Sequence, residues 1–169
     1  MGKQSRSILT NVQDGDVQPN AVDLRLSKVF AIKDNVFEIT NESKTHRGSV
    51  EIQPDDEGFF NLVPGSYEVV MENEIGIGDN EAGWVITRST LNRNGVFITS
   101  GLYDDGYGFN VGTGEFTGGA MAGCMHVGVG LARIRQGTRV AQYLSFDAES
   151  LHKYDGDYGN HKEHDKKYK

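Results

Sequence analysis

Short apolar runs separated by glycines are the feature of this sequence that most restricts its fold. The chain has 169 residues, of which 22 are glycine and 3 are proline. Val22, Leu24 and Leu26 alternate with polar neighbours, and the same two-residue period recurs over residues 67–71, as in strands with one buried face. Glycines between such runs are typical of turns and β-bulges. The sequence therefore predicts an all-β domain, folded as a barrel or a jelly-roll-like sandwich.

Several further segments are typical of strands, and one is typical of a helix. Residues 1–18 predict a loose arm or a short first strand, and residues 40–57 predict mostly loop. Residues 89–93 predict a helix of one or two turns. Residues 106–130 include nine glycines, which favours tight turns or close backbone approaches over a helix. The remaining strand-like runs are 29–39, 50–52, 59–63, 84–86 (expected to be buried), 96–98 and two runs within 131–146.

The length of the chain suits one domain with one core. We expect this domain over residues 1–151, followed by a flexible tail over residues 152–169 that could act as a lid. The net charge is −7, which argues against a nucleic-acid partner, because such a binder needs a basic face. Cys124 is the only cysteine, so no disulfide forms within the chain. Without a secretory signal or an apolar run long enough to span a bilayer, the sequence predicts a cytoplasmic protein with no membrane partner.

Four polar segments contain the residues with candidate chemistry. They are residues 19–26 (PNAVDLRL), 87–93 (TRSTLNR), 98–107 (ITSGLYDDGY) and 136–142 (QGTRVAQ). Each has a structural explanation when it is taken alone. Asp23 could be a solvated surface acid, and Arg88 could lie beside a helix cap. Asp104 could belong to an ordinary turn, and Gly137 could close a hairpin.

Taken together and in this order, the four segments resemble motifs of the superfamily that contains deoxyuridine triphosphatase and dCTP deaminase. The first is similar to P-N-[SA]-x-D-L-R-L and the second to G-R-S-S-L-x-R, with Thr87 and Thr90 in place of its first Gly and second Ser. The third is similar to V-T-A-G-x-I-D-x-G-[FWY] and the fourth to G-x-R-[IV]-[AG]-Q. The resemblance covers about residues 19–158, and the spacing from Arg88 to Asp104 needs no gap. It implies the distorted jelly-roll-like barrel of the trimeric deoxyuridine triphosphatase type, a homotrimer, and a pyrimidine deoxynucleoside triphosphate as substrate.

The second and fourth segments supply candidate phosphate contacts. Arg88, Ser89 and Thr90 place a guanidinium, two hydroxyls and backbone N–H groups at the start of a short helix, which suits an anion. The resemblance assigns this segment and Gln142 to the phosphates. A triphosphate brings Mg²⁺, held mainly by phosphate oxygens and water, and we expect no metal site built from protein side chains.

The third segment supplies the candidate catalytic base. The resemblance implies that Asp104 has this role, because hydrolysis of a phosphoanhydride needs a carboxylate within hydrogen-bond reach of the attacking water. The resemblance also implies that Tyr107 packs against the deoxyribose. Thr99 and Ser100 are further candidate substrate contacts. Positioning and charge neutralisation supply most of the remaining catalysis.

The sequence leaves hydrolysis and deamination open, because both reactions occur on this fold. In the deaminases a proton-shuttling Glu lies ten residues after the Asp that matches Asp104; this chain has Gly114 there, and Glu115 is one place late. A β-bulge could turn Glu115 into the pocket, or an insertion within residues 108–123 could leave it on a loop. Arg93 matches an Arg of the deaminase active site. We expect dUTP hydrolysis first, dCTP deamination (alone or together with hydrolysis) second, and a non-catalytic nucleotide-binding regulator third.

The tail has its own similarity to the deaminases. Residues 154–158 (YDGDY) are similar to Y-N-G-K-Y, a segment that folds over the bound nucleotide, which makes Tyr158 a candidate substrate contact. Asp157 stands in place of the Lys, where a carboxylate would repel phosphates, and a later lysine could take over the role. Three tail histidines are more typical of a solvated end than of a zinc site: His152, His161 and His164.

Overall fold

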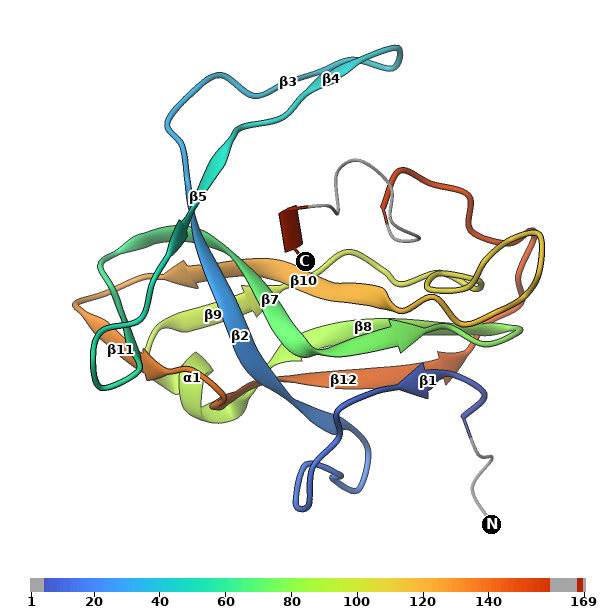
Figure 1. Ribbon diagram of the computed structural model, residues 1–169, viewed down its shortest axis with the longest axis horizontal. Coiled ribbons are helices and arrows are strands. Elements are labelled where there is room, and N and C mark those ends of the chain that lie inside the picture. Colours follow the sequence, from blue (N-terminus) through green and yellow to red (C-terminus); the bar gives the residue numbers. More distant parts are fainter. Residues whose placement is uncertain (1–4, 159–166, 169) are drawn as a thin grey trace.

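Antiparallel strands form nearly all of the regular structure of this chain (Figure 1). A computed structural model describes residues 5–158, 167 and 168. The strands are β1 Ile8–Leu9, β2 Val22–Ile32, β3 Glu38–Ile39, β4 Lys44–Thr45, β5 Ser49–Ile52, β6 Phe59–Leu62, β7 Gly65–Gly76, β8 Glu81–Thr87, β9 Val96–Thr99, β10 Gly119–Val127, β11 Ala132–Arg135 and β12 Arg139–Asp147. The predicted short helix is confirmed as α1, Ser89–Arg93. No helix in the described part of the chain has the length and apolar character needed to cross a membrane.

Most strands belong to one antiparallel sheet that nearly closes into a barrel. Its strand order is β8-β12-β2-β7-β10-β9, with β1 paired to β7 and β5 paired to β2. The two edge strands, β8 and β9, meet through the side chain of Thr87, the last residue of β8. Its Oγ1 donates to the carbonyl oxygen of Ile98 at 2.9 Å and accepts from the Ile98 N–H at 2.7 Å. A side chain thus replaces ladder hydrogen bonds between the two edge strands, and the predicted all-β, barrel-like fold is confirmed.

The barrel interior is filled by the inward faces of the long strands. Leu24 and Leu26 on β2, and Val69 and Met71 on β7, are each at most 4% exposed, as their alternation predicts. Burial of such side chains is the main favourable contribution to folding, about 1.5–3 kcal/mol for each. The cluster is completed mainly by Phe60, Leu62, Ile75, Ile77, Val85, Ile98, Met121, Met125, Val127 and Val140.

One outward-facing part of the barrel carries apolar side chains. The expectation that residues 84–86 are buried is wrong for two of the three: Val85 is 3% exposed, whereas Trp84 is 51% and Ile86 is 36% exposed. A strand pattern shows which residues share a face, and it does not show whether the chain itself covers that face. We call this surface the outer apolar face, and its members are Trp84, Ile86, Phe97, Leu144 and Phe146.

The glycine-rich segment after β9 leaves the barrel and returns to it at Gly108. The N–H groups of Thr117 and Gly118 donate to the Gly108 carbonyl oxygen, at 2.9 and 3.2 Å. Gly108 has a φ of 78°, and a Cβ there would lie 1.9 Å from the carbonyl oxygen of Ile75, so only glycine fits. Residues 109–118 therefore form an excursion closed at its base, after which β10 begins. The predicted turns and close approaches are confirmed.

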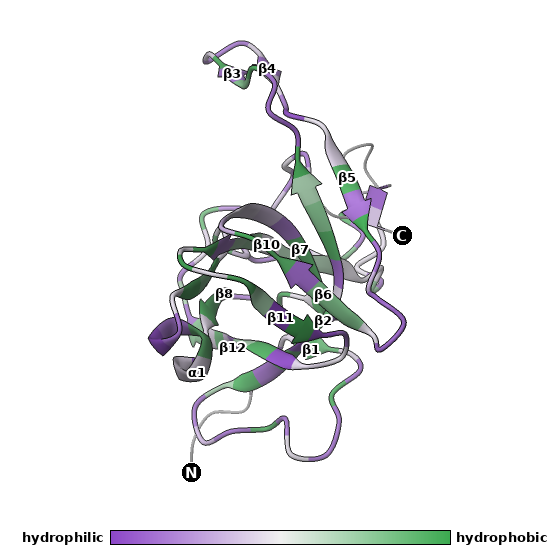
Figure 2. Cartoon of the chain, turned by 90° about the vertical axis from the view of Figure 1, so that its left-hand side faces the viewer, coloured by the Kyte–Doolittle hydropathy of each residue, from purple (hydrophilic) through white to green (hydrophobic). Residues whose placement is uncertain are grey.

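A thin arm projects from the barrel between β2 and β5 (Figures 1 and 2). Its strands β3 and β4 pair only with each other in the sheet topology of the described residues. The strand expected at residues 50–52 is confirmed as β5, whereas β4 lies in a stretch expected to be loop. The arm meets the tail, because Lys44 of β4 forms an ion pair with Asp157.

Candidate functional site

Asp104 lines a hollow next to the glycine-rich segment. Its neighbour Tyr103 is fixed to β8 by two backbone hydrogen bonds to Gly83, with N–O distances of 2.8 and 2.9 Å. On its other side, the Tyr107 N–H donates to the Asp104 carbonyl oxygen at 3.0 Å. The Asp104 side chain is exposed and lines a cavity of about 580 Å³. A short carboxylate side chain on a fixed backbone, open to water, is what a general base for a bound water requires.

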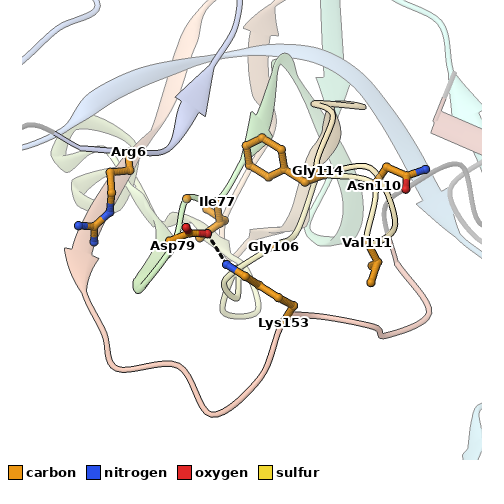
Figure 3. A pocket seen from close by; sticks show the side chains of 10 residues that line it. Arg6, Ile77, Asp79, Gly106, Asn110, Val111, Gly114 and Lys153 are labelled. Carbon is orange, nitrogen blue, oxygen red and sulfur yellow. Dashed lines mark hydrogen bonds and ion pairs between the residues drawn. The ribbon is translucent and has the colours of Figure 1, made fainter.

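The next residue, Asp105, is a buried anchor for the start of the tail. Its carboxylate is 6% exposed, accepts from the Asn80 N–H at 2.8 Å and pairs with Lys153, which also pairs with Asp79 (Figure 3). Burial would raise the pKa of Asp105, but the hydrogen bonds from Lys153, Ser150 and Asn80 outweigh it and hold that pKa below its ordinary value. The Tyr154 N–H donates to the Asp105 carbonyl oxygen at 2.7 Å. These contacts hold the first tail residues beside Asp104.

A second cavity, of about 500 Å³, is lined by tyrosines and shares Leu102 and Tyr154 with the first. Tyr103 and Tyr107 are each 7% exposed, and their ring centroids are 5.3 Å apart. Their hydroxyls donate to backbone carbonyl oxygens of β10 at 2.9 and 2.8 Å. Tyr154 adds a third ring, 5.5 Å from that of Tyr107. The volume and the aromatic lining suit a small molecule with a flat ring.

Arg88 and Gln142 converge on one buried carboxylate, that of Asp23. The pairing of β12 with β2 places Gln142 opposite Asp23. Gln142 Nε2 donates to Asp23 Oδ1 at 3.0 Å, and Arg88 Nε lies 3.3 Å from the same oxygen. Arg139 Nη1 lies 3.4 Å from Asp23 Oδ2. The interpretation of Asp23 as a solvated surface acid is wrong, because the residue is 0% exposed and its charge is balanced by these donors.

Three further candidates of the second segment lie on α1 and face solvent. Ser89, Thr90 and Arg93 are exposed. Arg88 precedes the helix without making a side-chain cap, and its Nη1 instead donates to the Arg139 carbonyl oxygen at 3.1 Å. Figure 1 shows α1 and the glycine-rich segment at opposite ends of the barrel. The chain by itself therefore does not bring the α1 residues together with Asp104.

The three remaining candidates of the barrel lie in different places. Ser100 Oγ accepts from the Val85 N–H at 3.2 Å, just after β9 and four residues before Asp104. Thr99 is exposed and lines a hollow of about 480 Å³ beside the outer apolar face. Glu115 is exposed on the excursion, where Thr113 Oγ1 donates to its carboxylate at 3.2 Å. Glu115 lines neither the Asp104 cavity nor the tyrosine cavity.

The described part of the tail lies over the tyrosine cavity. Tyr158 lines that cavity, and its N–H donates to the Tyr154 hydroxyl at 3.1 Å. Asp157 pairs with Lys44, so its charge is balanced by the arm. No three His, Cys, Asp or Glu side chains among residues 5–158, 167 and 168 gather as metal ligands. The following tail candidates lie outside the described residues: His161, His164, Lys162 and Lys166.

A family model described as dCTP deaminase-like matches residues 1–147, most of the chain. The chain belongs to the dCTP deaminase-like family. A protein of Halobacterium salinarum named "Probable deoxyuridine 5'-triphosphate nucleotidohydrolase" is 32% identical over 152 residues, which cover 87% of this chain and 85% of that protein. A protein of Persephonella marina named "dCTP deaminase, dUMP-forming" is 32% identical over 113 residues, which cover 64% of this chain and 62% of that protein.

A solved structure of a deaminase shows a similar fold. The crystal structure of 2'-deoxycytidine 5'-triphosphate deaminase from Agrobacterium tumefaciens superposes with a TM-score of 0.56 at 14% identity, covering 88% of this chain. The match spans 44% of the length of that deaminase chain. At this identity the likeness supports the barrel fold, in agreement with the strand arrangement.

Membership of the dCTP deaminase-like family confirms the resemblance drawn from the four segments. Sequence reasoning nevertheless missed three residues that organise the site: Asp23, Asp105 and Lys153. Asp23 had a usable signal, because a charged residue in the middle of an apolar strand needs a partner if it is buried. Lys153 had no such signal in the sequence, because its partners Asp79 and Asp105 are 74 and 48 positions away along the chain.

Proposed function

We propose that this protein hydrolyses dUTP to dUMP and pyrophosphate, with Asp104 as the base that activates the attacking water. The observation that carries the proposal is the adjacency of two cavities: one lined by the exposed Asp104 carboxylate and one lined by Tyr103, Tyr107 and Tyr154. A nucleoside in the tyrosine cavity would direct its phosphates toward Asp104. The name of the Halobacterium relative, and Gly114 in the place of the deaminase Glu, favour dUTP as the substrate.

The phosphate contacts come, in this proposal, from a second copy of the chain. Arg88, Ser89 and Thr90 are phosphate-binding candidates at the start of α1, at the end of the barrel away from the glycine-rich segment (Figure 1). Gln142, the fourth candidate, shares the Asp23 carboxylate with Arg88. The outer apolar face lies between these two ends, on β8, β9 and β12. Exposed apolar patches of this kind mark association surfaces. A closed homotrimer that buries this face would bring the Arg88 segment of one copy to the Asp104 cavity of the next.

Mg²⁺ enters this proposal as part of the substrate. Phosphate oxygens and water would hold most of its coordination sites, as is usual for magnesium. Its chemistry is to neutralise negative charge on the triphosphate. The cationic side chain of Arg88 would share that role, while Asp104 takes the proton from water. We place the reaction in the cytoplasm, because the single cysteine, Cys124, needs no oxidising compartment.

The tail acts, in this proposal, as a lid over the nucleoside. Tyr154 and Tyr158 line the tyrosine cavity, and Lys153 anchors the tail to Asp105. Closing a site over its substrate excludes water from the reacting groups and completes the set of contacts. The pairing of Asp157 with Lys44 keeps a carboxylate from repelling the triphosphate.

The variant Asp104→Asn tests the role of the base. It should bind a non-hydrolysable dUTP analogue as the wild type does, while kcat falls by about a hundredfold or more. Glu149→Gln is the matched control, because Glu149 is exposed, carries the same charge and lines the same cavity. Wild-type kcat in Asp104→Asn would remove this residue from the mechanism.

Mixing two inactive variants tests whether the site is shared between copies. Asp104→Asn and Arg88→Ala should each be inactive, and co-refolding them in equal amounts should restore about one quarter of wild-type activity, the share of sites that receive both native residues in a random cyclic assembly. Activity that stays at the level of the separate variants would show that each copy acts alone. A monomer by sedimentation that turns over dUTP would do the same.

Deamination of dCTP is the second candidate function. The name of the Persephonella relative and the match of Arg93 to a deaminase residue favour it. The position of Glu115 on an exposed loop outside both cavities weighs against it. Ammonia release from dCTP is the measurement that separates the two reactions.

A further inference from the structure

Glu68 is the one charged residue among the described residues that line the tyrosine cavity. It is the fourth residue of β7, between Phe30 on β2 and Cys124 on β10 in the ladder. Its side chain is 22% exposed, so the carboxylate is partly withdrawn from water. A partly buried charge at a cavity wall interacts more strongly with a bound polar group than a solvated charge does.

Two donors already hold the Glu68 carboxylate in a fixed orientation. Ser49 Oγ donates to Oε2 at 2.8 Å, and Lys167 Nζ lies 2.9 Å from both carboxylate oxygens. On the neighbouring strand, burial raises the pKa of the Cys124 thiol, and the charge of Glu68 adds to that effect. Cys124 therefore stays a neutral thiol, and the cavity wall offers Glu68 as its charged hydrogen-bond acceptor.

The wall around Glu68 leaves room for a flat ring. Ala120, Ala122 and Gly123 add little side-chain bulk to the cavity wall, and the rings of Tyr103 and Tyr107 also line it. The two tyrosine hydroxyls donate to carbonyl oxygens of Ala122 and Ala120. A pyrimidine ring between these surfaces would have its polar edge within reach of the Glu68 strand.

We propose that Glu68 contacts the edge of the pyrimidine base and tunes the protein's selectivity toward cytosine. Cytosine carries an amino group at ring position 4, which donates hydrogen bonds, whereas uracil carries a carbonyl oxygen there, which accepts them. A carboxylate accepts from the amino group and repels the carbonyl oxygen. Glu68 thus lets dCTP compete with dUTP for the same cavity. The inference rests on the proposed function, because it places the nucleoside in this cavity.

Binding of two non-hydrolysable analogues, α,β-imido-dCTP and α,β-imido-dUTP, tests the proposal by calorimetry. In Glu68→Gln, the ratio of the Kd for the dCTP analogue to the Kd for the dUTP analogue should rise about tenfold, because a charge-assisted hydrogen bond becomes a neutral one. Glu72→Gln is the matched control: Glu72 lies four residues along the same strand and does not line the cavity, so the ratio should stay at the wild-type value. A ratio in Glu68→Gln equal to that of the wild type would overturn the proposal.

A second measurement uses the wild-type protein and does not depend on the folding of a variant. An α,β-imido triphosphate of 2-pyrimidinone deoxynucleoside lacks the amino group at position 4, and it should bind about tenfold more weakly than the dCTP analogue. Equal affinities would contradict a contact with that group. If dUTP is hydrolysed and Glu68→Gln leaves the ratio of the two Kd values unchanged, the role of Glu68 is wrong and the proposed function still stands. If neither analogue binds, the proposed function fails with it.

Discussion

Replacing Asp23 by Asn would test whether the buried carboxylate holds the phosphate-binding side chains in place. The change keeps the shape of the side chain and removes its charge, which leaves the guanidinium groups of Arg88 and Arg139 without their counter-charge. Removing one partner of a buried ion pair costs about 3–5 kcal/mol. The Arg88 and Arg139 side chains are 28% and 37% exposed, so water screens part of the loss, and we expect about 2–3 kcal/mol. For a chain of this size that lowers Tm by about 5–10 °C.

The same variant has a functional readout that separates positioning from stability. Without the carboxylate, Arg88 and Gln142 lose their common anchor, so KM for dUTP should rise about tenfold while kcat changes less. Asp16→Asn is the matched control. Asp16 is also 0% exposed, and it pairs with Arg25, with 2.7 Å between Oδ1 and Nη2. It should lose stability with KM unchanged. An unchanged KM in Asp23→Asn, or an equal rise in both variants, would refute the reasoning.

Removal of residues 154–169 should lower kcat/KM for dUTP about tenfold with little change in Tm, because the lid is lost and the barrel core is intact; an unchanged kcat/KM would show that the tail is inert. Glu115→Gln should leave dUTP hydrolysis unaffected, since the residue lies outside both cavities; a clear drop in kcat would place it in the site. The unfolding free energy should fall as pH falls below about 4, since Asp16 and Asp105 have pKa values held below the ordinary 3.8 in the folded chain and take up protons more readily once unfolded. Urea unfolding at neutral and acid pH measures this loss, and equal free energies would contradict it.

Much of the barrel was predictable from the sequence because strand periodicity is a local property. The alternation at Leu24 and Leu26, the helix at residues 89–93 and the turns among the glycines are all present in the structure. The error at Trp84 and Ile86 has a physical reason: periodicity assigns both to one face, and burial of that face depends on what lies against it. An apolar outward face in a correctly placed strand therefore favours a partner surface.

The candidate site was less predictable, because its contacts join distant parts of the chain. Asp23 is paired with Arg88, Arg139 and Gln142, each more than 60 positions away, and that partnership depends on the register between β2 and β12. Counting along the sequence placed Glu115 one position from a family glutamate. The closure of residues 109–118 on Gly108 shows why that count is unreliable, since the excursion interrupts the strand register. Local patterns identified the segments, and the topology determined which of their side chains meet.

The products formed from dUTP and from dCTP test the central claim most directly. The purified protein should convert dUTP with Mg²⁺ into equal amounts of dUMP and pyrophosphate, separated by anion-exchange chromatography, and Asp104→Asn should leave dUTP intact. Ammonia release from dCTP without pyrophosphate release from dUTP would show that the protein is a deaminase. Binding of the dUTP analogue with neither nucleotide consumed would show a non-catalytic regulator, and either result would contradict the account.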